Sequence, residues 1–151
     1  MNIFQKILKY KKSTSTYAVG VVQAKAYRIL KQKTNEFLVT YGLSSTEWAL
    51  LGLLYETPEG HTFTDISVAL GVKGPFITRI AGTLLKKKVV GIQKTDLDNR
   101  TKQLILTIEG KRLVEHIEPL LKKESAQWLK GASTRDLISY LRILHIIIQN
   151  E

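Results

Sequence analysis

Apolar residues recur at helical spacing over most of the chain, and the polar residues between them mark helix ends. A long helix is predicted over about 13–41, because Gly42 follows it as a stop signal. Ser44, followed three residues later by Glu47, predicts a capping box that starts the next helix. That helix ends before the turn-forming Thr-Pro-Glu-Gly segment at 57–60.

Two further helices are predicted before the pattern changes. A short one starts near Thr62, with Asp65 three residues on, and stops at Gly71. The next begins at Pro75, a residue suited to the first helical turn. Its apolar positions fall at helical spacing and predict a core-facing stripe: Ile77, Ile80, Ala81, Leu84 and Leu85.

The period then shortens to that of β-strands. Runs at 89–94 and 103–107 predict a hairpin, joined by a basic turn at 98–100, Asp-Asn-Arg. Thr107 is expected to cap a helix reaching about residue 127, and the cap signature at 133–136 starts a final helix. The order is three helices, a fourth followed directly by a hairpin, and two more helices.

These elements predict a mainly α fold with a small β-hairpin wing, in a single domain over 1–151. A winged-helix core at 44–107 would be flanked by helical segments at 1–41 and 108–150. The end segments carry more apolar stripes than the core needs, so we expect them to form a homodimer. The stripe residues are Ile3, Phe4, Ile7 and Leu8, and Leu137, Leu141, Leu144, Ile147 and Ile148. For 1–12, a membrane-surface helix is the less common alternative.

Composition narrows the function. The net charge is +10, and residues 73–112 hold ten basic and three acidic residues, which favours a polyanionic partner over a solvated basic face. There is no cysteine, which excludes disulfides and thiolate metal sites. The longest uncharged run, 13–24, has 12 residues, too few to span a membrane. No secretory signal is recognisable, so we expect a cytoplasmic protein without a membrane partner.

The fourth helix has the features of a DNA reader. Its outer face offers hydroxyl, guanidinium and ammonium groups, which can bond bases and phosphates. It also carries one phenylalanine, Phe76, which could cover a thymine methyl or pack against Val72 or the third helix. Gly71 lies in the tight turn before it, as in many helix-turn-helix units, and the basic hairpin follows it. An ordinary amphipathic helix has a similar outer face. The turn before this helix and the basic hairpin after it are therefore what favours DNA binding.

At this point the chain resembles the MarR family of winged helix-turn-helix transcription regulators. The family's wing signature is matched by Asp98, Arg100, Leu106, Thr107 and Gly110. Its helix-turn-helix pattern is matched by Leu70-Gly71-Val72, Ile77-Thr78-Arg79 and Leu84, and its second helix by 43–54 with Trp48. The resemblance covers roughly 13–150. Phe76, Gly82 and Thr83 depart from the family's usual residues, so the DNA site need not be typical.

The resemblance implies a sequence-specific, DNA-binding transcription regulator: a homodimeric repressor on a palindromic operator, released by a small aromatic or lipophilic effector. Arg100 would enter the minor groove or bind its phosphates, and Asp98 would brace the wing or simply form the turn. A winged-helix protein-interaction module and a non-specific nucleoid-type DNA binder are the alternatives. The expected DNA-binding residues are Lys73, Pro75, Phe76, Thr78, Arg79, Thr83, Lys86, Lys94, Asn99, Arg100 and Lys102.

Other candidate residues give weaker indications of a function. Aromatic residues at helical spacing are usually core, but these could line an effector pocket: Tyr17, Tyr27, Tyr41, Trp48 and Tyr55. Glu115-His116 resembles part of a zinc site, but Leu120 stands where a second histidine is needed, so we expect neither metal nor other cofactor. His61 and His145 are the only other histidines. No nucleophile–base set or phosphate loop indicates an enzyme.

Overall fold

The computed structural model describes residues 16–95 and 98–150, with the side chains of 95–101 left out. The stripe at 3–8 and residues 96–97 therefore lie outside the described residues. The chain divides into two compact units, Met1–Glu118 and Pro119–Glu151. The elements in chain order are α2 (Thr16–Leu38), η1 (Val39–Tyr41), α3 (Ser45–Glu56), β1 (His61–Thr62), α4 (Phe63–Leu70), α5 (Gly74–Lys86), β2 (Val90–Thr95), β3 (Asp98–Leu106), α6 (Ile108–Trp128) and α7 (Thr134–Gln149).

The predicted helix boundaries are confirmed where the structure describes them. Complete capping boxes start α3 at Ser44, α4 at Thr62 and α7 at Ser133. The Thr107 hydroxyl accepts a hydrogen bond from the Gly110 N–H at 3.0 Å and so caps α6. Glycines in the left-handed region end η1 and α4, as expected of helix stops.

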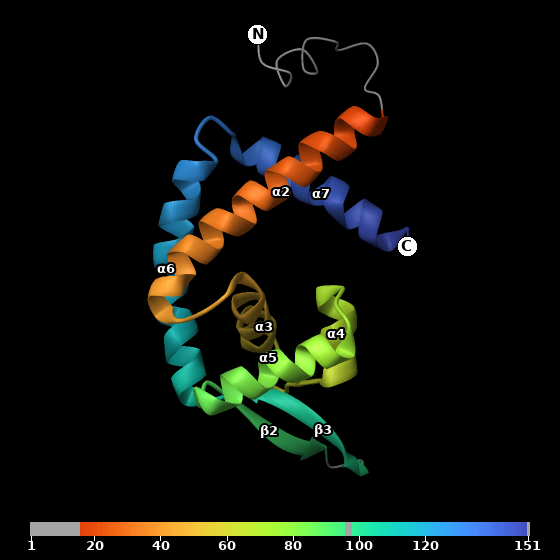
Figure 1. The fold of residues 1–151 in the computed structure, drawn as a ribbon, viewed down its shortest axis with the longest axis vertical. Helices are drawn as coiled ribbons and strands as arrows, with labels where there is room; N and C mark the ends of the chain where they lie inside the picture. The colour runs from red at the N-terminus through yellow and green to blue at the C-terminus, as the bar shows by residue number, and fades with distance from the viewer. Residues whose placement is uncertain (1–15, 96–97, 151) are drawn as a thin grey trace. The chain divides into compact units, whose positions relative to one another are not determined.

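The core of the first unit lies where α3, α4 and α5 pack together and onto the sheet (Figure 1). The predicted stripe of α5 faces this core, with Ile77, Ile80, Ala81 and Leu84 buried and Leu85 half-buried. The largest fully buried side chains are Leu38, Leu50, Leu51, Leu54, Ile66, Ile77, Leu84, Leu104 and Ile117. The mainly helical winged fold is therefore confirmed, with α5 beside the hairpin.

The sheet differs from the prediction in two ways. It has three antiparallel strands in the order β1-β3-β2, because His61 and Thr62 pair with Leu104 and Gln103. A two-residue strand is too short to show alternation, so the sequence carried no signal for β1. The hairpin is also longer than expected: Asp98 pairs with Thr95, which places 98–100 in β3 and not in the turn.

Gly110 allows α6 to start close against the sheet. A Cβ atom built on Gly110 would lie 2.0 Å from the Val89 carbonyl oxygen and 2.9 Å from a Leu106 methyl carbon. The Thr107 N–H donates to the same Val89 carbonyl, and the Thr107 hydroxyl donates to the Lys88 carbonyl. Only glycine leaves room for this crossing, which gives the glycine after the wing signature a physical reason.

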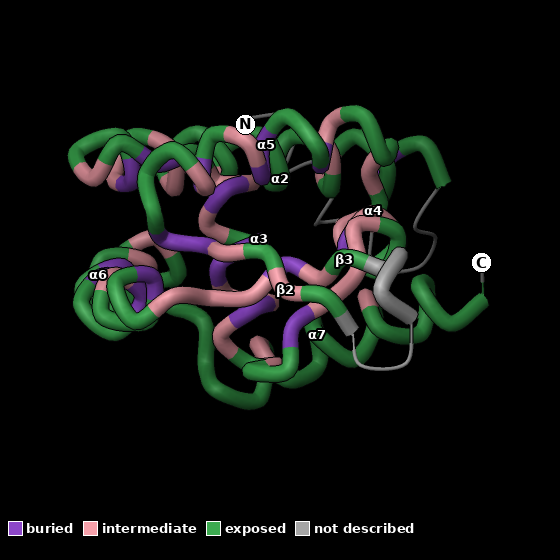
Figure 2. Tube along the Cα trace, turned by 90° about the horizontal axis from the view of Figure 1, so that it is seen from below, coloured by how far each residue is buried: buried purple, intermediate pink, exposed green. Residues whose placement is uncertain are grey.

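The second unit holds the end of α6 and all of α7. α6 continues through Pro119, which lacks the N–H of a helical hydrogen bond. None of the residues of α7 is buried in this chain (Figure 2). Its exposed apolar side chains are Ile138, Tyr140, Leu141, Ile143, Ile146, Ile147 and Ile148. Of the predicted stripe, Leu141, Ile147 and Ile148 are exposed, and Leu137 and Leu144 are half-buried.

Within the described part of the chain, no single helix has the length and apolar composition to cross a membrane. Two bent pairs, Thr16–Tyr41 with Ser45–Glu56 and Phe63–Leu70 with Gly74–Lys86, pass by length and composition only. Core helices of a folded protein meet the same criteria.

The capping carboxylates make the fold sensitive to acid. Hydrogen bonds from Thr62 and Ser133 lower the pKa values of Asp65 and Asp136. Burial raises the pKa of Glu47, but hydrogen bonds from Lys87 and Ser44 outweigh it and leave that pKa below its usual 4.5. Groups whose pKa is lower in the folded state stabilise the fold above their unfolded pKa and lose that contribution as pH falls through the folded value.

We therefore expect the free energy of unfolding to fall as the pH drops below about 4.5, with little change above it. Urea unfolding measured from about pH 3 to pH 7 checks this. The Glu47→Gln variant should show a shallower acid decline than the unmodified protein. An equally steep decline would exclude Glu47 as a contributor.

Candidate nucleic-acid interface

Helix α5 presents the predicted outer face to solvent. Its exposed residues are Lys73, Gly74, Pro75, Thr78, Arg79, Thr83 and Lys86. The Thr78 and Thr83 hydroxyls donate to the carbonyls of Gly74 and Arg79, at 3.2 and 3.3 Å. Each hydroxyl oxygen keeps lone pairs, so both threonines remain able to meet a further partner.

The N-terminus of α5 is open. Its N-cap residue, Lys73, makes no side-chain cap hydrogen bond, and Pro75 occupies the first turn. The other α-helices whose N-cap is described are all capped by a side chain, at Ser44, Thr62, Thr107 and Ser133. Pro75 has no N–H and the Phe76 N–H donates to the Lys73 carbonyl at 3.0 Å, so the positive charge of Lys73 is the main attraction for a phosphate at this helix start.

Phe76 is half-buried and not fully exposed, which fits the packing alternative, while its contact with DNA stays a prediction. The ring lines a hollow together with Leu70, Val72 and Tyr27. The Arg79 guanidinium lies over the same ring, with its carbon 4.9 Å from the ring centroid. The Phe76 ring thus lies between the core and the outer face of α5, where it makes a cation–π contact with Arg79.

The hairpin carries two lysines that face each other. Lys94 of β2 is directly opposite Lys102 of β3, and both side chains are exposed. They share a face of the hairpin with Val90 and Leu104, since alternate residues of a strand point the same way. Both of those residues are buried against the helical core. Directly opposed like charges destabilise a strand pair, so the arrangement favours an anion between or over them.

Asn99 and Arg100 belong to β3 by their backbone, but their side chains lie outside the described residues. Their roles in DNA binding, and that of Asp98, therefore stay predictions. Lys87 was not among the expected site residues; it is exposed, but its ammonium is directed toward the junction of η1 and α3. Its ammonium donates to the Glu47 carboxylate at 2.9 Å and to the Gly42 carbonyl at 2.5 Å. The signal was available, because Lys87 follows Ile80 and Leu84 at core spacing.

Two of the aromatic residues expected around an effector, Tyr27 and Tyr55, line different hollows. Tyr17 is exposed, and Tyr41 stacks edge-on against His116 at 6.0 Å. Trp48 is half-buried. Tyr27 lines the hollow of about 420 Å³ beside Phe76.

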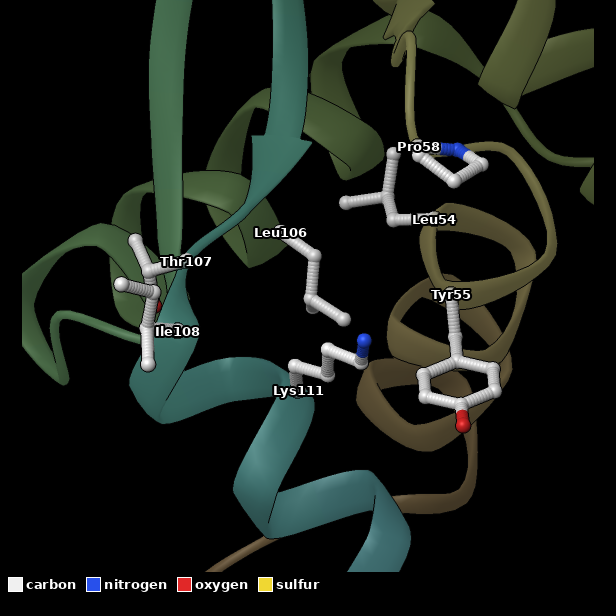
Figure 3. Close-up of a pocket in the computed structure, with 7 residues that line it drawn as sticks. All are labelled: Leu54, Tyr55, Pro58, Leu106, Thr107, Ile108 and Lys111. Atoms are coloured by element: carbon white, nitrogen blue, oxygen red, sulfur yellow. The ribbon is translucent and has the colours of Figure 1, made fainter.

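Tyr55 lines a separate hollow of about 330 Å³ at the end of β3 and the start of α6. Figure 3 shows Leu54, Pro58 and Leu106 around this space, with the Lys111 ammonium directed toward it. The Tyr55 hydroxyl lies 3.4 Å from the Glu115 carboxylate as a hydrogen-bond donor. Apolar walls with one ammonium suit a small, partly apolar anion.

Among the described residues, no three histidines or carboxylates gather as metal ligands.

Several solved structures share this fold. The S. aureus MepR–DNA complex superposes with a TM-score of 0.74 at 22% identity, over 87% of this chain and 97% of that chain. A MarR family transcriptional regulator from Rhodococcus sp. RHA1 gives a TM-score of 0.82 at 18% identity, over 92% and 99%. CouR from Rhodococcus jostii RHA1, bound to p-coumaroyl-CoA, gives 0.80 at 20% identity, over 86% and 91%.

No protein-family model matches the sequence. At these identities the likeness shows the fold, and it confirms the winged helix-turn-helix architecture that the chain's own motifs predicted.

Proposed function

We propose that the chain is a sequence-specific, DNA-binding transcription regulator of the MarR type that acts as a homodimer. One observation carries the proposal: an uncapped, basic helix α5 lies beside a hairpin whose Lys94 and Lys102 are directly opposed. Lys73 at the start of α5 and the opposed lysines of the hairpin both favour a polyanion. The fold shared with MepR, whose structure is a DNA complex, supports duplex DNA as that polyanion.

The side chains of α5 and the hairpin differ in chemistry, so each would make a different kind of contact with DNA. Thr78, Arg79 and Thr83 on α5 would meet base edges in the major groove, because a recognition helix reads DNA there. Lys73, Lys86, Lys94 and Lys102 would neutralise phosphates, a contribution that depends on salt and not on sequence. Asn99 and Arg100 would reach the adjacent minor groove.

Selection of bound genomic fragments by the purified protein tests the function. Recurrence of one palindrome, bound at least a thousandfold more tightly than random DNA, is the expected result for a specific regulator. Equal affinity for every fragment would instead identify a nucleoid-type binder. Absence of salt-dependent binding to any duplex would favour a protein-interaction module.

Arg100→Ala should weaken binding to all sequences and reduce the slope of log affinity against log salt by roughly one unit, because one phosphate contact is lost. Titrations of labelled duplex at several salt concentrations measure this slope. Arg135→Ala, which removes an exposed charge from α7, is the matched control and should leave the slope unchanged. An unchanged slope in Arg100→Ala would remove Arg100 from the interface.

The dimer rests on the exposed apolar face of α7. Leu141→Glu should shift the protein toward monomer, because a charge on that face cannot be buried without a partner. Light scattering at micromolar concentration gives the mass. Ser139→Glu adds the same charge away from the predicted stripe and should leave the dimer intact. If the unmodified protein is itself a monomer, the dimer proposal fails.

We further propose that a small aromatic or lipophilic effector releases the regulator from DNA. The hollow at Tyr55 and Lys111 supports this, since it offers apolar walls and one ammonium. CouR, which has the same fold, is bound to p-coumaroyl-CoA. Loss of DNA binding on addition of aromatic carboxylates, abolished by Lys111→Met, is the expected result.

A further inference from the structure

Glu47 is the one charged residue that is buried among the described residues, and it serves two partners. One carboxylate oxygen accepts the Ser44 N–H at 2.7 Å, which completes the cap of α3. The other oxygen accepts the Lys87 ammonium at 2.9 Å. A buried carboxylate with these hydrogen bonds stays charged, and the ion pair holds its geometry.

Lys87 reaches a second group from the same position. Its ammonium also donates to the carbonyl of Gly42, at 2.5 Å. Gly42 adopts a left-handed conformation, with φ of 67°, and follows directly on η1, where the helical segment begun by α2 ends. One side chain at the end of α5 is thus bonded to the end of the α2 segment and the start of α3, 45 and 40 residues away in sequence.

A second hydrogen bond joins α2 to α3 at this junction. The Asn35 side-chain oxygen accepts the Ser45 N–H at 2.7 Å. The junction of α2 and α3 is therefore fixed by its own bonds, and Lys87 fastens the end of the recognition helix to it. The angle at which α5 leaves this junction decides which base edges its outer face meets.

We propose that Lys87 and Glu47 are positioning residues for DNA recognition, and that Lys87, although it lies between Lys86 and Lys88, does not bind DNA. The proposal rests on the proposed function. The pair holds the C-terminal end of α5 at one angle to the α2–α3 junction, so its loss lowers discrimination between operator and random DNA. It leaves the number of phosphates neutralised unchanged.

Three variants test the pair: Lys87→Met, Glu47→Gln and the double variant. In the double variant neither charge is left unpaired, so it is the one best able to fold. The matched control is Lys86→Met, which removes the neighbouring exposed lysine. Circular dichroism establishes that each variant is folded before DNA is added.

For the double variant we expect operator affinity to fall roughly tenfold, while affinity for random DNA and the salt slope stay as in the unmodified protein. Glu47→Gln should weaken operator binding as Lys87→Met does, although it removes a negative charge. Lys86→Met should weaken both kinds of DNA and lower the slope by about one unit. A lower slope in the double variant, or tighter operator binding by Glu47→Gln, would overturn the proposal.

Amide hydrogen exchange separates this proposal from the proposed function. The Lys87 and Val89 N–H groups donate to the carbonyls of Thr83 and Leu84 at the end of α5. In the double variant both should exchange at least tenfold faster, whether or not the protein binds DNA. Unchanged exchange would show that the pair does not hold the helix end, and would overturn the proposal. Faster exchange with no DNA binding by the unmodified protein would overturn the proposed function, and with it the positioning role.

Discussion

Replacing Gly110 with alanine is expected to lower the free energy of unfolding by about 3 kcal/mol, at the upper end of the range for overpacked sites. The added Cβ would lie 2.0 Å from the Val89 carbonyl oxygen. Backbone cannot rotate aside as a side chain can, so the start of α6 would have to move. That movement would break the Thr107 hydrogen bonds to Lys88 and Val89 that join α6 to the sheet.

Urea unfolding of Gly110→Ala measures the loss, and Gly52→Ala is its control. Gly52 lies inside α3, and a Cβ there meets nothing within 4 Å. Alanine at this position should stabilise the protein by up to about 1 kcal/mol, since glycine is the poorer helix former. Opposite signs at the two glycines are the expected result. Equal stability of Gly110→Ala and the unmodified protein would mean that α6 does not cross the sheet this closely.

Arg79→Ala is expected to cost about 1–3 kcal/mol of discrimination at one base pair in each half-site, if its guanidinium reads a guanine. The Arg79 guanidinium lies over the Phe76 ring, with its carbon 4.9 Å from the centroid, so the ring helps to orient the guanidinium. Phe76→Leu keeps an apolar side chain in the hollow with Leu70 and Val72 but removes the aromatic face. Phe76→Leu should therefore lose less discrimination than Arg79→Ala, about 0.5–1 kcal/mol, at the same base pair.

Binding to a set of operators with single base changes measures both losses. The double variant should lose no more than Arg79→Ala alone, because the ring acts through the arginine. Thr78→Ala is the neighbouring control and should alter preference at an adjacent position. If substitutions at 76, 78 and 79 all leave sequence preference untouched, α5 does not read DNA and the proposed function fails.

Local signals predicted the helices well because each helix carries its own start and stop. The boxes at Ser44, Thr62 and Ser133 need only residues three positions apart, and all three form. The strand β1 escaped prediction because its two residues are ordered by β3, more than forty positions later. The start of β3 was misplaced for a related reason: Asp98 and Asn99 are typical turn residues, but pairing with β2 draws Asp98 into the strand.

The candidate site, like the fold, could be predicted only where local patterns determine the structure. Arg79 and Thr78 could be assigned to the outer face from the period of α5 alone. The spacing of Lys87 after Ile80 and Leu84 indicates the side of α5 on which it lies, but no local pattern reveals its partners Glu47 and Gly42, 40 and 45 residues away. The pairing of Lys94 with Lys102 depends on strand register, which a hairpin of uncertain turn does not define.

The pairing of Lys94 with Lys102 gives dissolved salt two opposite effects on the hairpin. Salt screens the repulsion between Lys94 and Lys102, so the free wing gains stability as ionic strength rises. The same salt removes the entropy gained when counterions leave DNA, so the complex loses affinity. If the chain binds DNA as proposed, a nucleic acid stabilises the folded wing most at low salt, where the repulsion between the two lysines and their attraction to a neighbouring phosphate are both strongest. Under the proposed function, protein isolated at low salt is expected to carry nucleic acid, and washing with concentrated salt is expected to release that nucleic acid without destabilising the hairpin.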